Sequence, residues 1–329
     1  MDKKILILKN DRVGDFFHSL RNIEHLRSHF SEHITDIYLS KINIRFASVL
    51  SQEKLNIIQV NYNLSFIEKF NLFLKLFRNN YEYVFILSPK NFYFFLPIVF
   101  RNTKFLGICV DNEKRKRPSI FLRKYLFKYE VNNRSKNIRK KPIYDMEKKL
   151  IENVIPSIRN QIPYKEIKYD VNGKPLDVLF HYKSNIFGDI DKNIHQFDEL
   201  FLQLTNKFNI KIRVSTDLEF KITENNYIEI FENNKNIQFL GPISADDLTK
   251  EVGCSDLIIS PHGAITCIGA YYNKNIIDIF DRTITKNAYF EFRPYTRGKY
   301  QFIFRSLDIK KTFFKISSKI NNLFELSNT

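Results

Sequence analysis

The stretch KILILKNDRVGD, residues 4–15, decides the fold at the very start of the chain. Its first part is a short run of Ile and Leu with the length and composition of a buried β-strand. A polar turn follows, and residues 15–30 then carry apolar side chains at helical spacing on one side. A strand that runs through a turn into an amphipathic helix is the first step of a parallel α/β sheet.

The same alternation continues along the chain. Further strands are predicted at residues 34–39, 57–60, 83–87, 104–108, 177–181, 211–214, 237–240, 257–260 and 275–280. Helices are predicted at residues 144–154 and 311–324, and Ser244 with Asp247 has the spacing of a helix cap. Residues 155–175 contain three prolines and a glycine, which is typical of a linker. We therefore predict two Rossmann-like parallel-sheet domains facing across a cleft, residues 1–170 and 171–329.

Composition narrows the class of protein. Of 329 residues, 52 are Lys or Arg and 36 are Asp or Glu, so the formal charge of +16 favours anionic partners. Three scattered cysteines are too few for a disulfide framework, which favours a reducing compartment. The most apolar run, residues 92–100, is too short to span a bilayer, and residues 5–8 are too short for a signal-peptide core. We expect a cytoplasmic protein.

The turn at residues 9–15 is the first candidate site, because ligands of parallel sheets bind at the carboxyl ends of strands. Gly14 would let the backbone turn sharply beside Asp15, which is a candidate general base. The alternative is that Asp15 or Asp11 merely caps the following helix.

A second candidate site is the segment Ser260-Pro261-His262-Gly263-Ala264-Ile265-Thr266, again between a strand and a helix. Its small residues would allow a diphosphate to approach the amides of a helix amino terminus. His262 could donate a hydrogen bond to that diphosphate. The alternative is a loop histidine without a role.

Residues 189–191, Asp-Ile-Asp, have the spacing that some sugar transferases use to hold a metal ion, but a solvated loop is the preferred interpretation. The neighbouring Lys192 is a better candidate for a phosphate contact. No G-x-G-x-x-G, P-loop or G-x-S-x-G motif occurs, which disfavours dinucleotide oxidoreductases, P-loop proteins and nucleophile-elbow hydrolases.

Taken together, these segments resemble glycosyltransferase family 9, the heptosyltransferase-like enzymes of lipopolysaccharide core assembly. The resemblance rests on the order of the opening strand and R-x-G-D turn, YEYVFIL at 81–87, NTKFLGI at 102–108, FLGPIS at 239–244, SDLIIS at 255–260 and NIIDIF at 275–280. It implies a GT-B architecture. One departure is Pro261-His262-Gly263 followed by Thr266, where the family has an Asp-Thr/Ser-Gly turn with a later histidine.

The resemblance also implies roles for individual residues. Asp15 matches the family's catalytic base. The loop at residues 262–266 matches its donor-diphosphate site, and Lys192 approximately matches its phosphate-facing lysine. Taking all the candidate segments together, we expect donor binding at Lys192, Ser244, His262, Gly263, Ala264 and Thr266, and acceptor binding at Arg12, Gly14, Lys114, Arg115 and Arg117. No cofactor and no metal ion are expected, since helix dipoles and cations can carry the charge of the leaving group.

The expected function is therefore inverting, metal-independent transfer of a sugar, heptose in the family, from a nucleotide-sugar to an anionic glycolipid or oligosaccharide of the lipopolysaccharide core. The basic, aromatic segment at residues 114–141 would face the inner-membrane surface, or else is a solvated loop. One alternative is a GT-B transferase of capsule or O-chain synthesis with a different donor. Another is a basic, non-enzymatic nucleic-acid- or glycolipid-binding protein, although no nucleic-acid-binding motif is present and no nucleic acid is expected.

Overall fold

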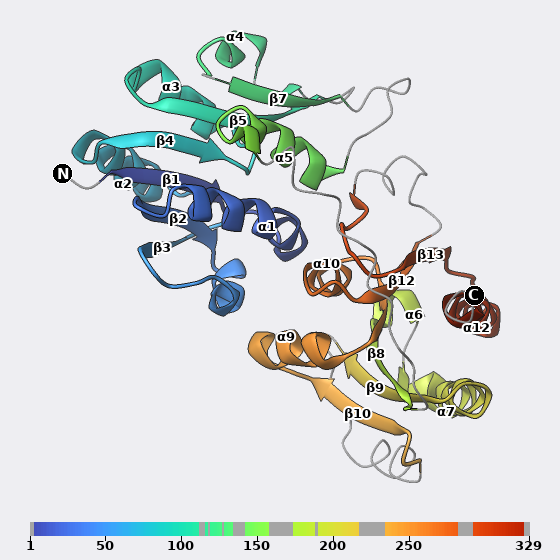
Figure 1. Ribbon diagram of the computed structural model, residues 1–329. Coiled ribbons are helices and arrows are strands. Elements are labelled where there is room, and N and C mark those ends of the chain that lie inside the picture. The colour runs from blue at the N-terminus through green and yellow to red at the C-terminus, as the bar shows by residue number, and fades with distance from the viewer. Residues whose placement is uncertain are drawn as a thin grey trace. The chain divides into compact units, whose positions relative to one another are not determined.

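The computed structural model describes nine stretches of the chain, namely residues 3–111, 116–117, 119–126, 128–133, 142–157, 174–187, 190–216, 234–281 and 292–325. The chain divides into two compact units, Met1–Pro163 with Lys286–Arg293 and Tyr164–Thr285 with Pro294–Thr329. The domain boundary predicted near Asp170 lies outside the described residues. Each unit holds one sheet (Figure 1).

The first unit alternates strands and helices in chain order. Its elements are β1 (Lys4–Lys9), α1 (Val13–His29), β2 (Ile34–Ser40), η1 (Asn43–Val49), β3 (Leu55–Val60), α2 (Phe66–Arg78), β4 (Tyr81–Ile86), η2 (Asn91–Phe95), α3 (Leu96–Val99), β5 (Lys104–Asp111), β6 (Lys116–Arg117), α4 (Ile120–Arg123), β7 (Lys128–Asn133) and α5 (Ile143–Glu152). The sheet has the order β3-β2-β1-β4-β5-β6, and β7 also pairs with β5. All these pairs are parallel except β5 with β6.

Side-chain alternation along the strands assigns the helices to the two faces of this sheet. Leu6 and Leu8 of β1 belong to a core cluster with Leu72 of α2, and the same cluster takes in buried residues of η2, α3 and α4. On the opposite face, Phe30 at the end of α1 contacts the rings of Tyr83 and Phe85. The helices α1 and α5 contact each other on that face (Figure 1). Burial on both faces explains why the strands are almost continuously apolar.

The second unit repeats the pattern. Its elements are β8 (Leu176–Tyr182), α6 (Ser184–Phe187), α7 (Ile190–Lys207), β9 (Ile210–Thr216), β10 (Ile237–Pro242), α9 (Ala245–Cys254), β11 (Leu257–Pro261), α10 (Ala264–Tyr271), β12 (Asn275–Phe280), β13 (Tyr300–Phe304) and α12 (Ile309–Glu325). The strand order is β10-β9-β8-β11-β12-β13, and every pair is parallel.

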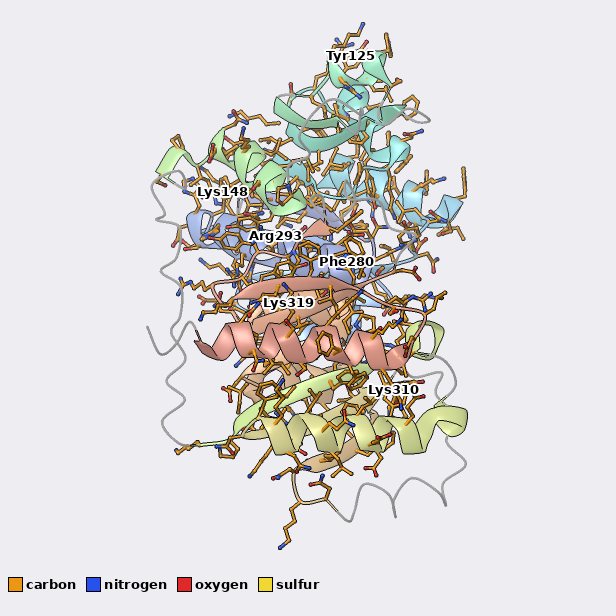
Figure 2. The ribbon with its side chains drawn as sticks, turned by 90° about the vertical axis from the view of Figure 1, so that its right-hand side faces the viewer. Tyr125, Lys148, Phe280, Arg293, Lys310 and Lys319 are labelled. Carbon is orange, nitrogen blue, oxygen red and sulfur yellow. The ribbon has the colours of Figure 1, made fainter. Side chains whose placement is uncertain are left out.

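Aromatic side chains fill one face of the second sheet. Helices α7 and α12 lie side by side there (Figure 2). Phe180 of β8 packs against Phe201 of α7 and Phe313 of α12, with ring centroids 5.0 and 5.7 Å apart. Helices α9 and α10 contact the strands β8, β11 and β12. The layered α/β class predicted for each half of the sequence is confirmed by these two sheets.

All ten predicted strands are present, with boundaries shifted by a few residues, and helices α5 and α12 match the two predicted ones. Three strands were not predicted: β6, β7 and β13. The basic segment at residues 114–141 was expected to face the membrane surface or to be a solvated loop. Its described part contains the helix α4 and the strands β6 and β7, which continue the first sheet, so the described part is not a plain loop. The expected membrane contact stays a prediction. Among the residues that the structure describes, no helix combines the length and apolar character needed to cross a membrane.

Candidate functional site

The turn after β1 lies at the switch point of the first sheet. In the order β3-β2-β1-β4-β5, the strands after β1 are added first on one side of β1 and then, from β4 on, on its other side. Ligands of parallel sheets bind at the point where the strand order reverses in this way. The loop after β4 is held against the end of β1, because the N–H groups of Leu87 and Ser88 both donate to the Leu8 carbonyl, at 3.1 and 3.0 Å. The carboxyl end of β1 therefore forms a candidate site.

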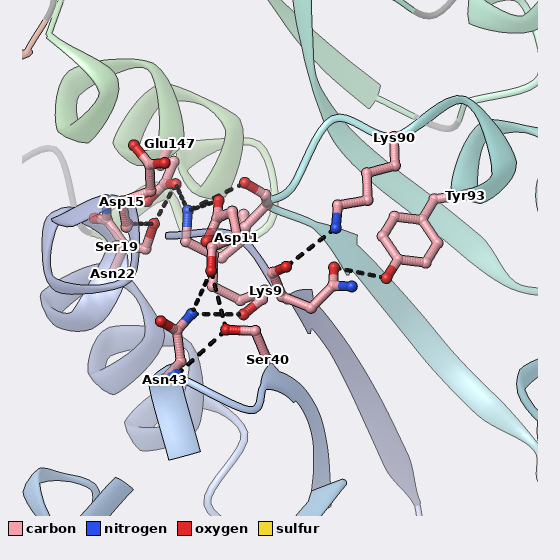
Figure 3. A network of polar contacts seen from close by, with 12 residues as sticks. Lys9, Asp11, Asp15, Ser19, Asn22, Ser40, Asn43, Lys90, Tyr93 and Glu147 are labelled. Atoms are coloured by element: carbon pink, nitrogen blue, oxygen red, sulfur yellow. Dashed lines mark hydrogen bonds and ion pairs between the residues drawn. The ribbon is translucent and has the colours of Figure 1, made fainter. Parts of the chain in front are cut away.

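A buried lysine organises this site (Figure 3). Lys9 is 1% exposed, and its Nζ lies 2.9 Å from Oδ2 of Asp11 and 3.4 Å from Oε1 of Glu147. Nζ also donates to the Leu87 carbonyl at 3.2 Å. Burial alone would lower the pKa of Lys9, but the charges of Asp11, Glu147 and Asp15 outweigh it and raise that pKa above its ordinary value. The ammonium group is therefore charged at neutral pH.

The helix α5 supplies Glu147, which is fully buried. Its carboxylate accepts hydrogen bonds from the Ser19 hydroxyl and, at 3.3 Å, from the Asn22 amide, both on α1. Burial raises the pKa of Glu147, against the opposing effects of Lys9 and these two hydrogen bonds. Glu147 thus ties α5, α1 and the end of β1 together.

Asp15 lies in the first turn of α1, and its environment favours the protonated form. Burial and, next, the charge of Asp11 raise the pKa of Asp15 from 3.8 to about 6, although Lys9, Arg12 and a hydrogen bond from the Arg12 backbone act in the opposite direction. A carboxylate with a pKa near 6 is suited to general-base work close to neutral pH.

Asp15 does not occupy the N-cap position of α1, but its carboxylate accepts a hydrogen bond from the residue that does. Arg12, not an acidic residue, occupies the N-cap position of α1, and its side chain forms no cap hydrogen bond. Asp15 instead accepts the hydrogen bond from the Arg12 backbone. The carboxylate of Asp15 therefore satisfies one backbone N–H group at the start of α1 and also lies at the switch point of the sheet.

The loop after β4 contributes a second lysine. Lys90 Nζ donates to the backbone carbonyl of Asn10 at 3.0 Å and to that of Tyr62, and it lies 4.3 Å from the centre of the Tyr62 ring. Burial lowers the pKa of Lys90 to about 8, partly offset by Asp11 and Glu68. The hydroxyl of Tyr93 donates to the Asn10 side chain at 2.7 Å (Figure 3). These contacts fix the turn that carries Asp11 and Asp15.

Of the five residues expected to bind the acceptor, two lie at the start of α1, one lies in β6 and two lie outside the described residues. Arg12 is exposed at the start of α1. Gly14 lies inside the first turn of that helix and is not among the described residues with positive φ, so the predicted sharp glycine turn is wrong. Arg117 belongs to β6, whereas Lys114 and Arg115 lie outside the described residues.

The second candidate site occupies the equivalent position in the second sheet. The order β10-β9-β8-β11-β12 places a switch point between β8 and β11, and His262 directly follows β11. His262 Nδ1 lies 2.8 Å from Oδ2 of Asp278, and the ring stacks on Phe280 with centroids 4.3 Å apart. Tyr300 donates to the same Asp278 oxygen at 2.7 Å. Asp278 is fully buried, so it fixes the orientation of the imidazole.

The start of α10 completes this second site. The first N–H groups of an α-helix have no partner within the helix and carry the positive end of its dipole, which suits an anion. Gly263 precedes the helix, and Ala264 is its first residue. The buried Thr266 hydroxyl accepts from the Gly263 N–H at 3.2 Å and donates to the Gly263 carbonyl at 2.8 Å. Thr266 therefore shapes the loop through its own backbone contacts.

Two further residues expected to bind the donor, Ser244 and Lys192, lie at the start of α9 and in α7. Ser244 is the predicted N-cap of α9, and its hydroxyl accepts from the Asp247 N–H at 3.1 Å and donates to its carboxylate at 2.7 Å. Lys192 belongs to α7. Asp189 lies outside the described residues. Within the described residues, no three His, Cys, Asp or Glu side chains gather to hold a metal ion.

The structure adds four residues that the sequence analysis did not select, namely Lys90, Glu147, Asp278 and Tyr300, and it gives a role to Lys9, which lies in the selected turn. For two of them the sequence holds a signal. Glu147 falls on the apolar side of a helix with Tyr144 and Leu150, and Asp278 interrupts the apolar run NIIDIF. A carboxylate at a position that predicts burial needs a partner, and so indicates a site.

No protein-family model and no curated protein matches the sequence. The fold is similar to that of the glycosyl transferase family 9 structure from Veillonella parvula, with a TM-score of 0.61 and 10% identity over 98% of this chain and 90% of that one. It is also similar to E. coli heptosyltransferase WaaC with ADP, with a TM-score of 0.64 and 12% identity over 97% of this chain and 99% of that one.

An epimerase has a similar fold as well. For the UDP-GlcNAc 2-epimerase from Methanocaldococcus jannaschii, the TM-score is 0.54 and the identity 12%, over 96% of this chain and 92% of that one. At these identities the similarity concerns the fold alone. The predicted resemblance is confirmed at that level: the chain has the GT-B fold that glycosyltransferase family 9 and the heptosyltransferases adopt.

Proposed function

We propose that the protein is a glycosyltransferase that moves a sugar from a nucleotide-sugar donor to a hydroxyl of an anionic surface-glycan acceptor. The observation that carries this proposal is Asp15. It is a carboxylate at the switch point of a parallel sheet, and its pKa is raised to about 6. The likeness to structures of family 9 and of WaaC with ADP supports a nucleotide-sugar as donor.

The mechanism is a single displacement. Asp15 accepts the proton of the acceptor hydroxyl while that oxygen forms a bond to the anomeric carbon and the bond to the nucleoside diphosphate breaks. Attack opposite the leaving group inverts the configuration of that carbon. The amino terminus of α10 and His262, which Asp278 orients at 2.8 Å, stabilise the departing diphosphate without a metal ion.

The acceptor is the less defined partner. The formal charge of +16 and the exposed Arg12 favour a phosphorylated glycolipid or oligosaccharide, of the lipopolysaccharide core or a related surface glycan. Such an acceptor would place the protein in the cytoplasm, at the inner face of the inner membrane. Capsule or O-chain synthesis with another donor fits the same site.

Calorimetry and thermal shift with ADP, UDP, GDP, CMP and their sugars test the donor site. We expect one nucleotide to bind selectively and to lose about ten- to hundredfold in affinity in His262→Ala, because a hydrogen bond to a charged group disappears. His29→Ala, which changes an exposed histidine of α1, should bind as the wild type does. No nucleotide binding, together with tight and salt-sensitive binding of generic RNA or DNA, would refute the proposal.

Turnover tests the role of Asp15. With the nucleotide-sugar that binds and a glycan acceptor, Asp15→Asn should lose about 10²- to 10⁴-fold in kcat while keeping its affinity for the nucleotide. An unchanged rate would exclude Asp15 as the base.

A nucleotide-sugar 2-epimerase is a second candidate, favoured by the similar fold of the M. jannaschii enzyme. An epimerase converts its nucleotide-sugar without any acceptor. Conversion of the donor to its epimer in the absence of acceptor, followed by NMR, would therefore decide for this alternative.

A further inference from the structure

Helix α2 carries an apolar stripe that faces solvent. Phe66, Phe70 and Phe77 are 83, 53 and 78% exposed, and their spacing places them on one side of the helix. Leu72 and Leu76, on another side, are buried in the core. A helix needs only one apolar side to pack on its sheet, so the second stripe is not explained by the fold.

Neighbouring elements extend this stripe. Buried residues of α2, η2, α3 and α4 share one core cluster, so these elements cover the same face of the first sheet (Figure 1). Phe73 of α2 packs against Phe100 after α3, with ring centroids 5.0 Å apart. The exposed apolar residues of these elements, here called the apolar face, are Phe66, Ile67, Phe70, Phe77, Phe95, Val99 and Phe121.

Cations accompany the apolar face and acidic residues are scarce there. Residues 62–110 contain only two acidic side chains, and both are engaged: Glu68 in the capping box of α2, and Glu82 with His33 at 3.2 Å. Exposed cations lie at the ends of these helices: Arg78 is the last residue of α2, Arg101 lies in the turn after α3, and Lys124 directly follows α4. Lys124 lies 4.2 Å from the centre of the Phe121 ring and 5.0 Å from that of Tyr125, a residue labelled in Figure 2.

We propose that the apolar face docks on the surface of an anionic lipid bilayer. Exposed Phe, Ile and Val side chains can enter the boundary between headgroups and acyl chains, while the neighbouring Arg and Lys side chains contact lipid phosphates. A bilayer is the occupant that matches both features, because it offers an apolar layer beneath an anionic one. The proposal deepens the proposed function, since it names the surface through which the first unit reaches a lipid-linked acceptor.

Flotation with vesicles tests the proposal. The full chain is mixed with vesicles of phosphatidylethanolamine and phosphatidylglycerol, or of phosphatidylcholine alone, and the bound fraction is measured. We expect binding to the anionic vesicles and at least about tenfold weaker partitioning of the triple variant Phe66→Ser, Phe70→Ser, Phe77→Ser. The matched control is Leu307→Ser with Phe314→Ser, which removes exposed apolar side chains from the second unit and should bind as the wild type does.

A charge-reversal variant tests whether the cations next to the apolar face contribute to binding of anionic lipid. Arg78→Glu, Arg101→Glu, Lys124→Glu should also bind at least about tenfold more weakly. The control Lys211→Glu, Lys235→Glu, Lys311→Glu changes the same charge at exposed sites of the second unit and should retain most of the binding. Equal losses in variant and control would mean that total charge, not the apolar face, drives the association, and would overturn the proposal.

Two further outcomes would also overturn it. In the first, the wild type does not float with anionic vesicles. In the second, the wild type is a dimer, and the triple phenylalanine variant is a monomer that floats as well as the wild type. The apolar face would then bind a second copy of the chain and not the bilayer. Flotation needs no turnover, so it separates the two proposals: a protein that floats but binds no nucleotide would refute the transferase and leave the docking surface standing.

Discussion

Lys9 shows how a single buried charge can set the chemistry around it. Its ammonium group lies within 4 Å of two carboxylates, those of Asp11 and Glu147, and stays charged although it is 1% exposed. Asp15 lies close enough for its pKa to respond to both Lys9 and Asp11. The two influences oppose each other, and burial, the largest effect, raises the pKa of Asp15 to about 6.

The pH dependence of activity should report this balance. A base must be ionised, so kcat/KM should rise with pH up to an apparent pKa near 6, rather than near the ordinary 3.8 of an aspartate. In Asp11→Asn the negative charge that raises the pKa of Asp15 is gone, so this limb should move to lower pH. A pH–rate profile of both proteins measures the shift. A limb that stays in place would mean that another group titrates.

The same raised pKa predicts an effect on stability. The folded state holds a proton on Asp15 more tightly than the unfolded chain does, so ionisation of Asp15 costs stability as pH rises from about 4 to about 6. Asp15→Asn should therefore raise the melting temperature at pH 7.5, and the difference from the wild type should disappear near pH 3.5. Thermal unfolding at several pH values measures this. A lower melting temperature of the variant at pH 7.5 would contradict it.

Removing the cation of the buried Lys9–Glu147 ion pair should lower the free energy of unfolding strongly. Lys9→Met leaves Glu147 buried without its cation, and we expect a loss of roughly 3–5 kcal/mol in the free energy of unfolding, measured by urea denaturation. Lys250→Met removes the cation of an exposed pair with Asp247 and should cost less than about 1 kcal/mol. Equal losses in the two variants would show that Lys9 is not held as the structure indicates.

The sequence predicts only part of the site. His262 directly follows β11, and Asp15 lies in the first turn of the helix that follows β1, so their location at the switch points could be expected from topology alone. Their partners could not be paired from sequence. Glu147 lies more than a hundred residues from Lys9 along the chain, and only the packing of α5 on α1 brings the two side chains together.

At the scale of elements, glycines give the sharpest test of the packing. A Cβ on Gly298 would lie 2.2 Å from the backbone oxygen of Lys274, whereas a Cβ on Gly253 in α9 would meet nothing within 4 Å. We expect Gly298→Ala to lower the free energy of unfolding by at least about 1–3 kcal/mol. Gly253→Ala should raise it by roughly 0.5–1 kcal/mol, because alanine is the better helix former. Thermal unfolding of the two variants measures both, and a neutral Gly298→Ala would contradict the contact with Lys274.

Two of the three strands that were missed, β6 and β7, were missed for the same reason. The apolar strands next to the sheet centre are buried on both faces and can be recognised from composition. By contrast, β6 and β7, with sequences KR and KYEVNN, are rich in polar residues. Pairing with a neighbouring strand makes such segments into strands, and pairing is not visible in local sequence.

At the scale of the whole molecule, the two sheets share one plan. Both place their first strand beside the fourth, in the orders β3-β2-β1-β4-β5 and β10-β9-β8-β11-β12. Each therefore has a switch point, occupied in one unit by carboxylates and a buried lysine and in the other by a histidine and a helix amino terminus. One topology thus gives each unit a cluster of polar groups at the carboxyl ends of its central strands.

The net charge predicts how the whole molecule responds to salt. With 52 basic and 36 acidic residues, the folded chain carries +16, and repulsion among like charges opposes the compact state. Salt screens this repulsion over a distance of about 10 Å at 0.1 M. Salt also weakens exposed ion pairs, but such pairs contribute little. Repulsion should therefore dominate the salt response.

The melting temperature should accordingly rise by on the order of 2 °C between 20 and 300 mM NaCl, which scanning calorimetry can measure. Chloride is used instead of phosphate or sulfate, because those anions could bind at the start of α10 and stabilise the second unit for a different reason. Repeating the scan with the Lys211→Glu, Lys235→Glu, Lys311→Glu variant, which has a lower net charge, should give a smaller rise. A melting temperature that falls with salt would mean that ion pairs outweigh the repulsion, so that the excess of cations is matched locally by acidic partners.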